Sequence, residues 1–469
     1  MKRFIFSLVL IGFLGIGSMG CRAEEPENDL RETEIEALEA ALATPSNPET
    51  TEATETKKEV SKLDNVLNRL HIGGYGEVAL SREFYSDNVY RYKNPSEYKN
   101  APSHGRFDIP HAVIYIGYDF GKGWTLQTEI EFEHGGSGSA TEKEWDEGGE
   151  WEQEIEKGGE VELEQFWIQK TICKEFNIRV GHIVVPVGLT NAYHEPLNFF
   201  TVYRPEGENT ILPCTWHDTG ISLWGRSGDF RYEVQVIAGL DAYNFDRDGW
   251  VADGPNSAFE FKTANKYGFV ARVDNYTFKG LRIGISGYYG QSMNNTYPHD
   301  VAGSTVSNDD VKGTVVIGSI DFTYQGHNWI ARGNADYGYL SDAKKISELK
   351  NSASAGTSNP YAGSIVGKNA YAIGVEAGYD IFSQIRKLRE DKQKLYIFGR
   401  YDIYDSYIPA SGQLTTYQYT KKIAMTFGLN YYPLKQIVVK GEFSKRFLKS
   451  GYNDEPSVNI GIAYQGYFF

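Results

Sequence analysis

The chain has 469 residues, and only 41% of them are hydrophobic. No stretch reaches the roughly 18 to 20 consecutive apolar residues that a membrane-spanning helix needs, which excludes a polytopic helical membrane protein. A membrane β-barrel is still allowed, because a barrel strand is apolar on one face only. The formal net charge of −15 argues against nucleic acid as a partner, since a phosphate backbone demands a basic surface.

The composition favours strands over helices. The chain carries 33 Tyr, 25 Phe and 50 Gly but only 4 Met. Aromatic residues favour strands and the interfacial girdles of membrane barrels, whereas a helical protein of this length would carry more Met, Leu and Ala. We therefore expect an all-β fold.

Residues 1–23 have the pattern of a signal peptide. Lys2 and Arg3 precede an apolar run, and small residues lead to a cleavage site after Ala23. Cleavage removes three basic residues and brings the formal net charge from −15 to −18. The alternative is that Cys21 becomes a lipidated N-terminus, although Ser18 stands where lipoprotein signals usually carry Leu.

Residues 24–69 differ from the rest of the chain. Apolar residues recur at helical spacing among acidic ones, on both sides of a stretch rich in Pro, Thr and Glu. We expect a short helical or disordered acidic segment in the periplasm, with a linker inside it. It is either a solvated tail or a small coiled-coil or plug-like element.

From residue 70 to the end, apolar and polar residues alternate with period two. One example is Leu281, Ile283 and Ile285, which alternate with polar or small neighbours. A soluble sandwich can also produce such strands. Sixteen strands are predicted, at about 70–84, 106–120, 123–134, 159–172, 175–187, 218–226, 229–240, 264–275, 280–290, 311–325, 328–340, 368–382, 393–404, 422–433, 435–446 and 457–469.

The links between these strands alternate between short and long, with one longer turn at 383–392 among the short ones. Tight periplasmic turns and long extracellular loops are typical of an outer-membrane barrel, so we predict a transmembrane antiparallel β-barrel of about sixteen strands. The terminal aromatic pair fits the signal that barrel-insertion machinery reads, with Phe468 rather than Phe469 on the lipid side. Outer-membrane lipid and lipopolysaccharide are then expected partners.

The link 188–217 is unusually apolar and aromatic for an exposed loop. Such side chains need burial, so we expect the loop to fold inward and narrow the lumen, unless it packs on a neighbouring protomer or caps the mouth. The expected constriction residues are Asn191, Tyr193, His194, Glu195, Phe199, Phe200, Tyr203, Arg204, Glu206 and Glu208.

Four runs resemble the phosphate-selective porin O and P family: Arg179–Leu189, Thr215–Gly225, Leu163–Ile168 and Ile72–Glu77. The similarity extends over 70–469 and is distinctive only in 158–225. The resemblance implies a sixteen-stranded outer-membrane channel that is usually a homotrimer. Members with anion selectivity carry a ladder of inward arginines and lysines.

Charges of both signs fall on the face assigned to the lumen. This mixture is not a one-signed ladder and suits general diffusion at least as well as phosphate selectivity. The lumen-lining charges are predicted to be Arg179, Arg231, Arg272, Arg282, Arg332, Arg400, Lys440, Glu129, Glu131 and Asp336.

No catalytic site, metal site or cofactor is predicted. His217 and Asp218 are adjacent on a strand and should point to opposite faces. The histidines at 104, 111, 182 and 194 lack metal-ligand spacing. The acidic link 135–158 lacks the spacing of an EF-hand loop and is more typical of a solvated surface loop.

The sequence therefore predicts a porin in the outer membrane of a Gram-negative bacterium, through which small hydrophilic solutes or ions diffuse passively. Two alternatives stay open. One is an anion- or phosphate-selective channel, and the other is a surface binding protein or adhesin anchored by its barrel.

Overall fold

The structure is a computed structural model. It describes residues 67–135, 141–143, 155–157, 161–255, 264–293, 295, 311–352, 365–413 and 417–468. The predicted signal peptide, nearly all of 24–69 and most of the acidic link 135–158 lie outside these residues. Within the described part of the chain, no helix is long and apolar enough to cross a membrane.

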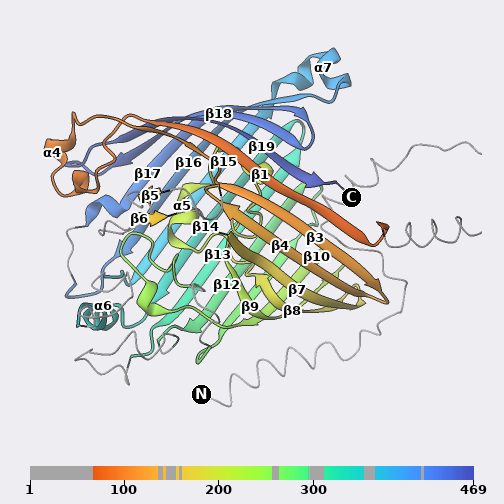
Figure 1. Cartoon of the computed structure of the whole chain (residues 1–469), viewed down its shortest axis with the longest axis horizontal. Helices are drawn as coiled ribbons and strands as arrows, with labels where there is room; N and C mark the ends of the chain where they lie inside the picture. Colours follow the sequence, from red (N-terminus) through yellow and green to blue (C-terminus); the bar gives the residue numbers. More distant parts are fainter. Residues whose placement is uncertain are drawn as a thin grey trace, which may run out of the picture.

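The described strands form one closed antiparallel barrel and a separate pair, β5 (Thr141–Lys143) and β6 (Ile155–Lys157) (Figure 1). The barrel strands are β1 (Leu70–Glu83), β2 (Gly105–Asp108), β3 (His111–Gly121), β4 (Trp124–Glu133), β7 (Val161–Cys173), β8 (Phe176–Val184), β9 (His217–Ser227), β10 (Phe230–Ile237), β11 (Gly268–Asn275), β12 (Leu281–Gln291), β13 (Thr314–Gly326), β14 (Trp329–Leu340), β15 (Asn369–Asp380), β16 (Lys394–Ile408), β17 (Lys421–Leu434), β18 (Ile437–Leu448) and β19 (Glu455–Tyr467).

The predicted sixteen-stranded barrel is confirmed. Apart from β2, each barrel strand pairs with the barrel strands before and after it in the chain, and β1 closes the ring by pairing with β19. On its other side β1 pairs with both β2 and β3, which share one position in the barrel. The sequence predicted a single strand there, but Pro110 lacks the N–H that a continuous ladder needs, and the strand is interrupted at residues 109–110.

Side chains on the barrel alternate between an apolar outer face and a polar inner face. Ile285 and Ile320 are 59% and 58% exposed, whereas Ser286 and Asp321 beside them are 5% and 1% exposed. Phe468 continues this outer face beyond β19 and stacks on Tyr464. Lipid can cover the outer residues, and the inner ones need polar partners within the barrel.

Short and long links lie at opposite ends of the barrel. Figure 1 shows the long-link helices α4 (Pro95–Tyr98) and α6 (Ala343–Ser352) at one end, and α7 (Arg386–Glu390) with the C-terminus at the other. The longer turn predicted at 383–392 contains α7 and η5 (Ile381–Gln384). Asp380 holds it by accepting hydrogen bonds from the backbone N–H of Phe382 and Leu395, both at 3.0 Å.

An apolar cluster occupies part of the barrel interior on the long-link side. It joins inward residues of β11 to β16 to residues of the links 185–216 and 238–267 and of α6. Trp250 is fully buried there, and its Nε1 donates to the Gly367 carbonyl at 3.2 Å. A Cβ at position 338 would lie 2.0 Å from the Trp250 ring, so only glycine fits beneath it.

The outer face generates a prediction. Ile285 lies at the middle of β12, and Phe278 lies in the turn before that strand with 63% exposure. Ile285→Arg should lower the free energy of unfolding by about 2–4 kcal/mol and Phe278→Arg by about 0–1 kcal/mol, because the cost of a lipid-facing charge falls toward the interface. Reversible urea unfolding in lipid vesicles measures both values. If both variants lowered the free energy of unfolding by the same amount, a lipid-facing β12 would be contradicted.

Candidate functional site

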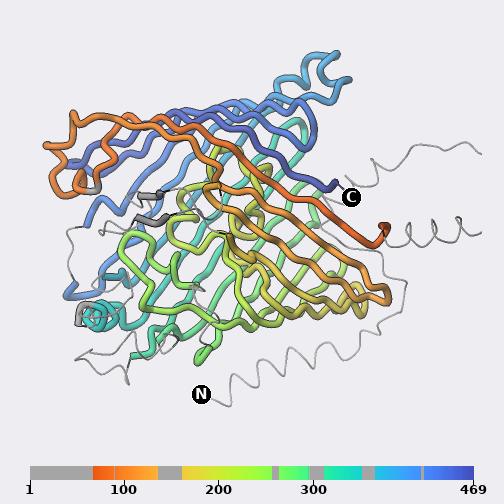
Figure 2. The backbone as a smooth tube through the Cα atoms, in the orientation of Figure 1, coloured from red at the N-terminus to blue at the C-terminus, as the bar shows by residue number. Residues whose placement is uncertain are grey.

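The link between β8 and β9 lies inside the barrel. It contains η2 (Pro196–Asn198), which contacts β1 and β19, and α5 (Glu206–Ile211), which packs on β15 and β16 (Figures 1 and 2). The predicted strand 175–187 ends at Val184, so this inner loop runs over 185–216 rather than 188–217. We call residues 185–216 the inner loop.

Asn191 joins the two ends of the inner loop. Its side-chain amide donates to the Val185 carbonyl, and its Oδ1 accepts from the backbone N–H of Trp216. Both Asn191 and Trp216 are fully buried. The Val185 N–H still donates to the Trp216 carbonyl at 2.8 Å, and Asn191 supplies the partners for the Val185 carbonyl and the Trp216 N–H.

Glu208 organises the turn next to Asn191. Its carboxylate accepts from the backbone N–H groups of Leu189, Thr190 and Asn191 at 3.0, 2.7 and 3.1 Å. Gly188 has φ +85°, and a Cβ there would lie 2.3 Å from Glu208 Oε1. The position thus requires glycine both for its backbone angle and for the approach of the carboxylate.

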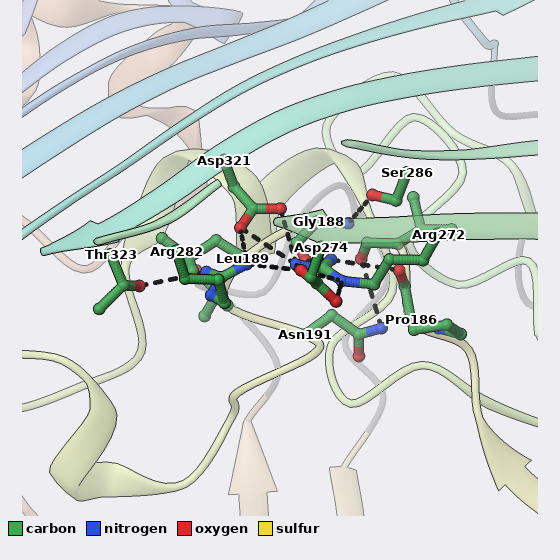
Figure 3. Close-up of polar contacts among 12 residues, drawn as sticks. Pro186, Gly188, Leu189, Asn191, Arg272, Asp274, Arg282, Ser286, Asp321 and Thr323 are labelled. Carbon is green, nitrogen blue, oxygen red and sulfur yellow. Dashed lines mark hydrogen bonds and ion pairs between the residues drawn. The ribbon is translucent and has the colours of Figure 1, made fainter. Parts of the chain in front are cut away.

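Two arginines and two aspartates of the barrel wall hold the start of the inner loop (Figure 3). Arg272 donates to the carbonyls of Pro186 and Gly188 at 3.3 and 2.9 Å. It also pairs with Asp274 at 2.9 Å and Asp321 at 3.0 Å, as Arg282 does at 2.9 and 2.6 Å.

Tyr193 completes this cluster from the loop side. The guanidinium groups of Arg272 and Arg282 lie 5.7 and 4.6 Å from the centre of its ring. Such cation–π contacts suit buried arginines whose charges are already paired. The predicted constriction residue Tyr193 therefore packs on two of the predicted lumen charges.

The opposite wall binds the middle of the inner loop through Lys440. Its buried Nζ donates to the carbonyls of Pro196, Phe199 and Thr201 at 2.6, 3.1 and 2.8 Å. On the same strand, Glu442 accepts from the backbone N–H of Val202 at 2.9 Å. The wall thus supplies a cation for loop carbonyls and an anion for a loop N–H.

Phe200 fills the space between β14, β15 and β16. It stacks on Phe398 with centroids 5.1 Å apart, and the Arg332 guanidinium lies 5.1 Å from its ring centre. A Cβ at Gly378 would lie 2.5 Å from the ring. Glu376, which the sequence analysis did not single out, pairs with Arg332 at 2.7 Å and accepts from the Phe200 N–H at 3.4 Å.

Arg400 is a further partner of Glu376, at 3.2 Å, and it also pairs with Asp402 at 2.6 Å. The remaining predicted wall charges also have polar or aromatic neighbours. Arg231 pairs with Glu233 at 2.7 Å, and Arg179 donates to Gln169 and lies 4.3 Å from the Trp167 ring centre. Asp336 accepts from Asn334 at 2.6 Å, and Glu129 from Gln165.

Three more of the predicted constriction residues lie further along the inner loop, at positions 195, 203 and 206. Glu206 pairs with Arg446 at 2.6 Å and accepts from the Tyr404 hydroxyl. Burial raises the pKa of Glu206, but Arg446 and Lys422 outweigh it and hold that pKa below its usual range. Tyr203 accepts from Ser81 at 3.0 Å, and Glu195 accepts from Asn198 at 2.8 Å.

Arg204 points to a different part of the wall, formed by β1 and β4. It donates to the Tyr75 hydroxyl at 3.3 Å and to the Cys214 carbonyl at 3.2 Å, and it lies 4.0 Å from Glu131. Burial raises the pKa of the Cys214 thiol to about 12 despite this nearby guanidinium. The thiol therefore stays protonated at neutral pH and is a poor nucleophile.

His217 and Asp218 do not contact each other as an acid–base pair. His217 lies 2.5 Å from a ring nitrogen of His182 and 3.5 Å from Glu162, whereas Asp218 accepts from the Thr219 N–H at 2.8 Å. What the sequence analysis missed is a buried group from three distant parts of the chain, Glu129, Glu164 and His194.

No family model matches the chain. An uncharacterized protein of Aquifex aeolicus (strain VF5) is 25% identical over 406 residues, which cover 85% of this chain and 80% of that protein. The high-pH structure of OprB from Pseudomonas putida has 11% sequence identity and a TM-score of 0.52, over 88% of this chain and 96% of that one.

An anion-selective porin from Comamonas acidovorans is also similar, with 9% identity and a TM-score of 0.49, over 84% of this chain and 99% of that one. At 11% identity the likeness to OprB shows the fold alone. The similar solved structures are outer-membrane porins, whereas the phosphate-selective porin O and P family expected from the sequence is not confirmed.

The backbone contacts of Glu208 generate a prediction. Glu208→Gln should replace one acceptor oxygen by an amide that faces a backbone N–H, at a cost of about 1–3 kcal/mol. Local opening should then expose the amides of residues 189–191 about 5 to 150 times more often. Hydrogen exchange of peptides covering these residues measures the change.

Asn198→Ala is the matched control, because Asn198 hydrogen-bonds through its side chain only to Glu195 within the same loop. It should leave exchange at residues 189–191 within about twofold of the wild-type rate, because the carboxylate that binds their N–H groups belongs to Glu208 and not to Glu195. Unchanged exchange in Glu208→Gln would contradict the role given to Glu208.

Proposed function

We propose that the protein is an outer-membrane porin, through which small hydrophilic solutes or ions diffuse passively. The observation that carries the proposal is a closed sixteen-stranded barrel with an apolar outer face and a charged inner face, crossed by an inner loop bound to several of its strands. A barrel of this size is wide enough for an aqueous channel, and the inner loop then sets its size limit.

General diffusion is favoured over phosphate selectivity by the way the wall cations are paired. Arg231, Arg272, Arg282, Arg332 and Arg400 each lie within 4 Å of a carboxylate. Lys440 is bound by loop carbonyls. A guanidinium that already holds a carboxylate has few donors left for a phosphate. These residues therefore hold the inner loop and its wall, and they tune ion preference only weakly.

The resemblance to the phosphate-selective family supports two further parts of the proposal, a homotrimer and insertion by the barrel machinery. It also supports the rival, a phosphate-selective channel. In that rival, Arg179, Arg204 and Arg332 are the cations whose neutralisation should lower phosphate flux while leaving neutral sugars unaffected.

Planar-bilayer recording tests the proposal directly. The mature protein should give steady open currents and a reversal potential near zero under a KCl gradient, and added phosphate should not block the current. A strong anion preference with block at low phosphate would establish the rival selective channel. Absence of current from a folded, heat-modifiable barrel would refute the porin.

Lys440 gives a second test, of the inner loop as the constriction. Lys440→Met removes hydrogen bonds to three carbonyls, each from a charged donor and worth about 1.5–3 kcal/mol. The loosened loop should give a larger and noisier single-channel current. Lys435→Met, in the exposed turn before β18, is the matched control and should behave as wild type. Identical currents from Lys440→Met and wild type would mean that the loop does not limit conduction.

A further inference from the structure

We infer that Glu129, Glu164 and His194 form a binding site for a divalent transition-metal ion that joins the inner loop to the barrel wall. Glu129 lies on β4, Glu164 on β7 and His194 in the inner loop. One ligand atom from each residue lies within 4.8 Å of the other two, and all three side chains are at most 2% exposed.

A β-bulge directs Glu164 into this site. The pairing of β7 with β4 shifts register, so that Glu129 faces Gln165 and Ile130 faces Leu163, and Glu164 is left without a partner in β4. Successive residues of a regular strand point to opposite faces, but Glu164 and Gln165 are both buried while Leu163 and Phe166 are exposed. Bulges commonly redirect a side chain beside a functional site.

The Glu164 carboxylate is fully buried, and apart from a marginal contact with the Thr215 hydroxyl neither of its oxygens has a hydrogen-bond partner. Its ion-pair contact is the Nε2 of His194, at 3.5 Å from Oε1. In a tetrahedral site, bonds of about 2.1 Å place neighbouring ligand atoms about 3.4 Å apart. The Glu164 and His194 atoms therefore already lie at the distance expected between two ligands of one ion.

The groups around the site orient the ligands. His194 Nδ1 lies 3.1 Å from the Asn191 carbonyl, which can only accept, so Nδ1 carries a proton and Nε2 faces Glu164. Gln165 donates to one oxygen of Glu129. Such partners behind the ligands are typical of metal sites, where they fix the imidazole tautomer and the carboxylate orientation.

The surrounding charge favours a cation. Four more carboxylates lie on the same two strands and on β1: Glu131 and Glu133 on β4, Glu162 on β7 and Glu77 on β1. Facing them, Arg204 lies 4.0 Å from Glu131, His111 lies 2.7 Å from Glu77, and His217 lies 3.5 Å from Glu162. Buried carboxylates need a compensating positive charge.

The donor set selects the kind of ion. One imidazole nitrogen with two carboxylates suits Zn²⁺ and similar divalent transition metals, whereas Mg²⁺ and Ca²⁺ prefer all-oxygen sites. The ion would link β4 and β7 to the inner loop a few residues from Asn191. This inference does not depend on conduction, because the site is complete in the folded barrel.

Calorimetric titration of the folded protein in detergent tests the site. The mature chain, without a polyhistidine tag and stripped of metal, is titrated with ZnCl₂ and separately with MgCl₂. We expect one Zn²⁺ per chain with micromolar or tighter affinity, and much weaker Mg²⁺ binding. Glu164→Gln should weaken Zn²⁺ binding at least about 10-fold. Loss of a group that only supports a metal ligand already weakens metal binding by about 10- to 100-fold, and Glu164 is proposed as a ligand itself.

Glu133→Gln is the matched control. Glu133 belongs to the neighbouring group with His111 and Glu131, so its loss should leave the Zn²⁺ affinity within about threefold if the proposed ligands are correct. Loss of binding in Glu133→Gln but not in Glu164→Gln would overturn the assignment, as would the absence of Zn²⁺ binding to the wild type. The latter result would mean that His194, His217 and Arg204 compensate Glu164 without a metal ion.

Two measurements keep the test decisive if Glu164→Gln folds poorly. His194→Gln changes the loop rather than the wall, and it should also weaken Zn²⁺ binding at least about 10-fold. Co²⁺ in place of Zn²⁺ should give the visible absorption of a four- or five-coordinate ion in the wild type. The same spectrum from wild type and His194→Gln would contradict ligation by His194.

Discussion

The structure depends on the closure of one ring of backbone hydrogen bonds. Lipid offers no partner for an N–H or C=O group, so every strand must be paired on both sides. The pairing of β1 with β19, from Gly73–Tyr467 to Glu83–Ser457, removes the two edges that an open sheet would leave. Once the ring is closed, the alternation of side chains divides the residues of each strand between lipid and interior.

The barrel interior contains buried polar groups that need partners, and the inner loop supplies many of these partners. Many inward side chains are charged and buried, and a buried charge is stable only with partners. The loop is rich in backbone groups that need partners as well, since it forms only short helical turns. Lys440 with three loop carbonyls and Glu208 with three loop N–H groups each satisfy both needs at once. The paired charges are therefore part of the architecture and leave little for solute recognition.

Much of this could be predicted from the sequence because strand alternation and link length are local signals. The sixteen strands and their order follow from them, and the aromatic content of 188–217 indicated burial. Pro110 was also a local signal, because it indicates the interruption between β2 and β3 where a single strand was predicted. Glu376 also lay in phase with the inward residues of its strand and could have been found.

The remaining details depend on contacts between distant residues. Glu164 belongs to the outer face by simple alternation, and only the register shift against β4 turns it inward. Its contact with His194 joins a strand to a loop and has no fixed spacing in the chain. The end of β8 at Val184 likewise follows from Asn191 and Arg272, which hold the chain away from β9.

The position of the inner loop constrains the order in which the molecule assembles. Pro196 meets Lys440 across 244 residues of chain, and Arg204 reaches back to Tyr75 across 129. Contacts this far apart in sequence form late, because a long segment must first be brought together. The inner loop is made before β11 to β18, which supply most of the wall residues that hold it, so it must already lie within the curving sheet when β19 meets β1. A loop left outside at that moment could return only by opening the ring.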